Sequence, residues 1–166
     1  MSTLRREPTG ASKEEGREEM KTLIAIDPGA NGGIASIEHE DIRAVPMPDG
    51  LTAMVDLLVS IKAHCPDARA IVEKTGGYMP GNSGPASVKF ARHCGHIEAA
   101  LYALGIPTEQ VAPTVWQKAL GALPKDKAER KRAIKEEMAR RFPGLNVTLK
   151  TADALGILVW AMGRKG

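Results

Sequence analysis

Aromatic residues and cysteines are scarce in this sequence. Phenylalanine, tyrosine and tryptophan together make up 4% of 166 residues, although hydrophobic residues account for 43%. A core can therefore be buried, and it must consist mainly of aliphatic side chains. The two cysteines, Cys65 and Cys94, have no paired spacing, which argues against a disulfide framework or a zinc ribbon.

Long apolar runs are also missing. No stretch approaches the roughly 18 apolar residues of a membrane-spanning helix, and no hydrophobic signal segment follows Met1. We therefore expect a soluble, cytoplasmic protein that does not act at a membrane. Residues 1–20 are rich in charge and poor in large apolar side chains. That composition predicts a disordered tail at 1–20, followed by one domain at 21–166.

The body of the chain alternates between short apolar runs and amphipathic segments. A glycine-rich turn separates two of the first three runs, which favours an antiparallel meander. The expected strands are 23–26, 34–37, 42–47, 70–73 and a short extended segment within 107–113; the expected helices are 51–65, 86–104, 114–120, 127–142 and 152–162. This order predicts an α/β fold, with a mixed sheet and helices on both of its faces.

Three carboxylates stand where apolar segments end or begin. Asp27 and Glu73 each close an apolar strand, and Asp153 lies in the first turn of an apolar helix. Singly, they could be a turn residue, a solvated strand end and a partner of the helix dipole. Together they lie where sites form in open α/β sheets. Because burying a carboxylate is costly without a compensating partner, the pattern indicates a site for Mg²⁺ or Mn²⁺.

Four motifs in order resemble those of RuvC-type Holliday junction resolvases. They are IAIDPGANGGIA around Asp27, VEK around Glu73, SVKFARHCGHIEAAL on the following helix, and ADALGIL around Asp153. The resemblance covers residues 22–163. The segment APTVWQKAL resembles phage and chloroplast junction resolvases more than it resembles the typical bacterial enzyme.

The resemblance implies an RNase H-like fold with a five-stranded mixed sheet. It further implies a homodimer that makes paired nicks across a four-way DNA junction, with Mg²⁺ or Mn²⁺ and two ions at each active site. Asp27, Glu73 and Asp153 match three of the four acids of the family. Such an enzyme is a crossover junction endodeoxyribonuclease of DNA recombination and repair, in a bacterial cytoplasm or in that of a phage host.

The fourth acid of the family is replaced here by Lys150. A charged lysine cannot ligate Mg²⁺. Three interpretations are open: Lys150 contacts the scissile phosphate as a catalytic residue, or it points away while three acids hold the metal, or the segment is shifted and activity is weakened.

Basic residues around these motifs are candidates for contact with DNA. Residues 125–141 carry eight basic and four acidic side chains, which alone could be a solvated helix face. Beside a nuclease-like site, contact with phosphates is the better interpretation. The resemblance adds a loop aromatic, Tyr78, which would stack on a base. The nucleic-acid-binding candidates are Tyr78, Ser87, Lys89, Arg92, Lys118, Lys127, Arg130 and Lys131.

Three other functions compete with junction resolution. The same fold and metal could act on RNA or on other branched DNA. A junction-binding protein with weak catalysis or none is a second alternative, prompted by Lys150. An actin-like ATPase or kinase also opens with Asp-x-Gly after a strand, but it requires a second such motif and a much longer chain.

Overall fold

A single mixed sheet organises the computed structural model, which describes residues 22–76, 81 and 83–164. Its strands run in the order β3-β2-β1-β4-β5. β1 (Leu23–Asp27), β2 (Gly33–Glu38) and β3 (Asp41–Pro46) form the predicted antiparallel meander, while β4 (Arg69–Glu73) and β5 (Thr108–Val111) continue the sheet in parallel with β1. The predicted five-stranded α/β fold is confirmed. The expected tail at 1–20 lies outside the described residues.

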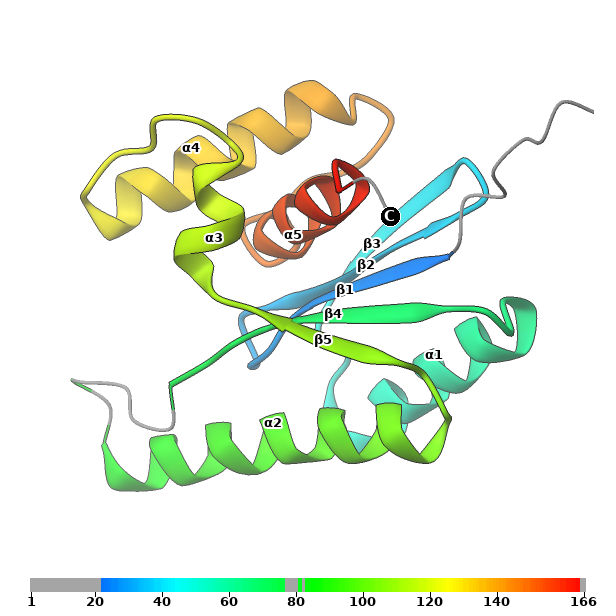
Figure 1. Cartoon of the computed structure of the whole chain (residues 1–166). Helices are drawn as coiled ribbons and strands as arrows, with labels where there is room; N and C mark the ends of the chain where they lie inside the picture. Colours follow the sequence, from blue (N-terminus) through cyan, green and yellow to red (C-terminus); the bar gives the residue numbers. More distant parts are fainter. Residues whose placement is uncertain (1–21, 77–80, 82, 165–166) are drawn as a thin grey trace, which may run out of the picture.

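Helices cover both faces of the sheet (Figure 1). α1 (Gly50–His64) and α2 (Gly84–Ala103) lie on one face, and α3 (Pro113–Lys118), α4 (Lys127–Arg141) and α5 (Ala152–Met162) lie on the other. Successive side chains of a strand point to opposite faces. Ile24 and Ile26 accordingly pack in the cluster with α1 and α2, whereas Ala25 packs in the cluster with α5.

The helix α5 is the centre of the second layer. Its apolar side chains surround it almost completely, a pattern typical of a buried helix, and Ala152, Ala154, Leu155, Ile157 and Leu158 are fully buried. α5 packs on β1 and β2, so its first turn lies near the end of β1. In the part of the chain that the structure describes, none of the helices could span a membrane.

Candidate active site

The three predicted carboxylates meet at one pocket. Ile26 of β1 pairs with Val72 of the parallel strand β4, so the residues that follow, Asp27 and Glu73, leave the sheet at the same edge. Asp153 reaches this edge from the first turn of α5. All three line a pocket of about 420 Å³. Its other walls come from residues 28–32, Thr75, Phe90, Gln117, Lys127, Arg130, Lys131 and Ile134.

The turn between β1 and β2 is built closely around Asp27. Gly29 has a φ of +105°, and the Gly32 amide donates to the Gly29 carbonyl at 3.0 Å. A Cβ atom on Gly32 would lie 2.0 Å from the backbone oxygen of Asp27 and 3.0 Å from its Cγ. Position 32 therefore accepts only glycine unless the Asp27 backbone or the turn shifts.

Burial works against the charged form of each carboxylate. Asp27 is 8% exposed, and its burial, reinforced by the neighbouring Glu73 and Asp153, raises its pKa to about 8. Burial is also the main cause that raises the pKa of Glu73 and of Asp153. Three acids in one pocket, each with a raised pKa, indicate a site that requires positive charge.

A buried indole holds Glu73 in place. Trp116 Nε1 donates a hydrogen bond to Glu73 Oε2 at 2.8 Å, which favours the carboxylate and lowers the Glu73 pKa against the effect of burial. Trp116 is fully buried. The sequence analysis did not predict the hydrogen bond from Trp116 to Glu73. A signal for it exists in the sequence, because a buried indole N–H group requires an acceptor.

The first half of α4 brings positive charge to the same pocket. Lys131 Nζ lies 3.3 Å from Asp153 Oδ2, and its charge lowers the pKa of all three carboxylates. The other carboxylate oxygen, Asp153 Oδ1, is buried and has no hydrogen-bond partner among the described residues. Lys127 and Arg130 line the pocket beside Lys131.

Lys150 stands apart from these groups. It is exposed and does not line the pocket. It lies in a turn that is closed by hydrogen bonds. The Thr148 amide donates to Oγ1 of the buried Thr151 at 2.9 Å. The structure thus brings together the three acids predicted from the sequence, and it does not bring Lys150 to them.

Four further candidates for DNA contact lie away from the pocket lining. Lys89 and Arg92 are exposed on α2, where Ser87 is half-buried, and Lys118 is exposed at the end of α3. None of these four lines the pocket. Tyr78 lies outside the described residues. The candidates that line the pocket are therefore Lys127, Arg130 and Lys131.

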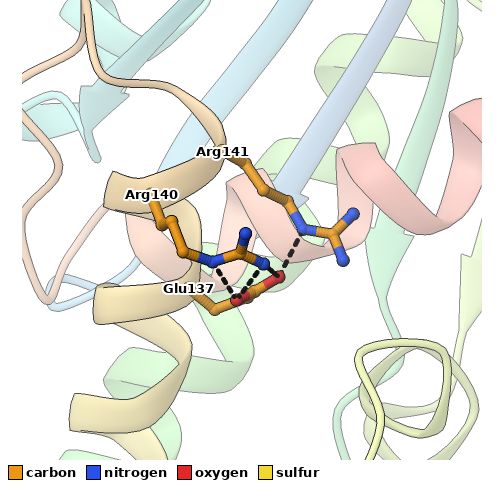
Figure 2. A network of polar contacts seen from close by, with 3 residues as sticks. All are labelled: Glu137, Arg140 and Arg141. Carbon is orange, nitrogen blue, oxygen red and sulfur yellow. Dashed lines mark hydrogen bonds and ion pairs between the residues drawn. The ribbon is translucent and has the colours of Figure 1, made fainter.

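The second half of α4 differs electrostatically from the first. Figure 2 shows Arg140 and Arg141 both bound to Glu137, with Arg140 Nη2 and Arg141 Nε 2.8 Å and 2.6 Å from Glu137 Oε1. One carboxylate thus offsets part of the charge of both guanidinium groups. The basic segment at 125–141 therefore separates into a half that lines the pocket and a half with a local ion pair network.

The chemistry of the three acids fits a divalent metal ion. Their oxygens are the hard donors that Mg²⁺ and Mn²⁺ prefer, and Asp153 Oδ1 is buried without a partner among the described groups. Among the residues that the structure describes, however, no three His, Cys, Asp or Glu side chains are arranged so that they could hold a metal ion as they stand. Asp153 is instead paired with Lys131.

The raised pKa of Asp27 predicts that the metal-free protein loses stability as the pH rises. Folding shifts this pKa from 3.8 to about 8. Between these values the folded protein keeps a proton that the unfolded chain has released, so the contribution of Asp27 to the free energy of unfolding falls through this range. Asp27→Asn removes the titration. Thermal unfolding in EDTA should show the melting temperature of the variant rising relative to wild type between pH 5 and pH 8; parallel curves would contradict the assignment.

Two solved structures similar to this chain are both of RuvC from Thermus thermophilus. The first, in complex with a Holliday junction substrate, is 18% identical with a TM-score of 0.58, and the match covers 86% of this chain and 96% of that one. The second is 19% identical with a TM-score of 0.50, covering 84% and 92%. No family model and no curated protein matches this chain.

Proposed function

Since the chain has the RNase H-like fold of RuvC, we propose that it is a metal-dependent, structure-selective endonuclease that resolves four-way DNA junctions. The observation that carries this proposal is the meeting of Asp27, Glu73 and Asp153 at one pocket with a basic wall. The RuvC structure described as a complex with a Holliday junction supports the choice of substrate.

We assign the metal ligands to the three acids. Two Mg²⁺ or Mn²⁺ ions bound in each site would activate a water molecule and stabilise the charge that develops on the phosphate. Asp27, Glu73 and Asp153 would hold the ions, and Trp116 orients Glu73 through its N–H group. The turn at residues 28–32 keeps the Asp27 carboxylate at the sheet edge.

The basic groups would hold the DNA. Lys127 and Arg130 line the pocket from α4, where their charges can bind the phosphates on either side of the scissile bond. Arg130 Nη1 also donates to the Lys125 carbonyl at 2.8 Å, which fixes the start of the helix. We further propose that Ser87, Lys89, Arg92, Lys118 and Tyr78 extend this contact. A homodimer would supply the two sites that symmetric nicks require.

A cleavage assay on three substrates tests the function. The full chain is incubated with a four-way junction, a duplex of the same sequence and a structured RNA, each with Mg²⁺, Mn²⁺ or EDTA. We expect paired nicks in the junction alone, dependent on metal. Equal cleavage of all three substrates would refute junction selectivity, preferential cleavage of RNA would support an RNA nuclease, and tight junction binding without any cleavage would support a binding protein.

A further inference from the structure

Lys131 occupies a particular position among the cations of the pocket. Its Nζ lies 3.3 Å from Asp153 Oδ2, and the two side chains are 34% and 17% exposed. Lys127 and Arg130 line the same pocket, but neither forms an ion pair with any of the three acids among the described residues. Arg130 instead donates to the carbonyls of Pro124 and Lys125. Among the described residues, Lys131 is therefore the basic side chain that forms an ion pair with one of the acids.

The surroundings explain why a cation is required there. Three carboxylates share a pocket in which one of them, Asp27, is 8% exposed. Carboxylates that are brought together and partly dehydrated repel one another, and a nearby positive charge relieves that repulsion. The charge of Lys131 acts on all three, since it lowers each of their pKa values.

We propose that Lys131 is a built-in counter-ion of the acidic pocket, which offsets part of its negative charge in the absence of metal and competes with the divalent ion for Asp153. This inference rests on the proposed metal site. It places beside the acids, at Lys131 of α4, a positive charge that Lys150 does not bring to the pocket. One of the three acids, Asp153, is held by the ammonium group of Lys131.

Lys131 affects the affinity of the pocket for a divalent ion through the charge of its ammonium group. An ammonium group beside an incoming divalent cation repels it. Its ion pair with Asp153 Oδ2 also leaves only Oδ1 of that carboxylate without a partner among the described residues. Removing the charge therefore tightens metal binding. In the metal-free protein the same removal leaves three carboxylates without their shared counter-ion, so the melting temperature in EDTA falls.

Titration calorimetry with Mn²⁺ and no DNA tests this proposal. Lys131→Met keeps most of the aliphatic stem and removes the charge, so we expect about tenfold tighter Mn²⁺ binding than wild type, with a lower melting temperature in EDTA. Lys131→Gln should behave in the same way, and Lys131→Arg, which retains the charge, should bind Mn²⁺ as wild type does. Lys135→Met removes a lysine of the same helix that does not line the pocket, and its affinity should be unchanged.

Four outcomes separate this inference from the proposed function. Unchanged or weaker Mn²⁺ binding by Lys131→Met would overturn the inference, and weaker junction binding in that case would make Lys131 a phosphate contact. The inference would also be overturned if a Lys150→Met variant bound Mn²⁺ more tightly than wild type while Lys131→Met did not. If Mn²⁺ binding follows the expected order but no junction is cut, the inference stands and the proposed function fails. If no form of the protein binds Mn²⁺, both fail.

Discussion

Replacing Asp27 by asparagine is expected to abolish metal-dependent cleavage of a four-way junction while leaving junction binding intact. The asparagine keeps the size of the side chain but removes a charged metal ligand at the centre of the pocket. Loss of the several kcal/mol that a metal ion supplies to the transition state corresponds to at least about a thousandfold slower cleavage. Single-turnover cleavage with Mg²⁺ measures the rate, and a gel-shift assay in Ca²⁺ or EDTA measures binding.

The raised pKa of Asp27 supplies an internal control for this variant. At pH 8 without metal, Asp27→Asn should be at least as stable as wild type, because the asparagine carries no charge to be buried beside Glu73 and Asp153. Lost cleavage would then not be the result of unfolding. Asp56→Asn changes an exposed carboxylate on α1 and should cut at the wild-type rate. Substantial cleavage by Asp27→Asn would refute its assignment as a ligand.

The order of the elements was predictable because local patterns determine it. Alternating and continuous apolar runs identified β1, β2 and β4, and apolar side chains all round α5 indicated that it is buried. The meeting of Asp27 and Glu73 was also expected, since both close apolar strands and sites form at the carboxyl ends of strands in open α/β sheets. These conclusions depend on the sequence within each segment and on one rule of topology.

The contacts of the acids were less predictable because they depend on packing between distant segments. Trp116 reaches Glu73 across 43 positions of the chain, and Lys131 reaches Asp153 only because α4 packs on α5. Lys150 was a candidate because it stands where the resemblance expects a fourth acid, three residues before Asp153. It precedes α5, however, so helical spacing does not bring it and Asp153 to one face.

The β1–β2 turn joins the stability of the fold to the geometry of the site, and Gly32→Ala tests both. The added Cβ would lie 2.0 Å from the Asp27 carbonyl oxygen, a backbone atom that can move only if β1 or the turn moves. We expect the free energy of unfolding to fall by about 3 kcal/mol, at the upper end of the cost of overpacking. Because the same Cβ lies 3.0 Å from Asp27 Cγ, cleavage by the folded fraction should also fall, by about a hundredfold.

Two measurements separate these effects. Urea unfolding gives the change in stability, and single-turnover cleavage at a temperature where the variant is still folded gives the change in rate. Gly95→Ala is the matched control: it lies within α2, nothing lies within 4 Å of its added Cβ, and the substitution should raise the stability by about 0.5–1 kcal/mol through helix propensity. If Gly32→Ala lost stability but cut junctions at the wild-type rate, the turn would support the fold without positioning Asp27. A loss of both would mean that the close approach of Gly32 to Asp27 fixes the carboxylate on which the proposed chemistry depends.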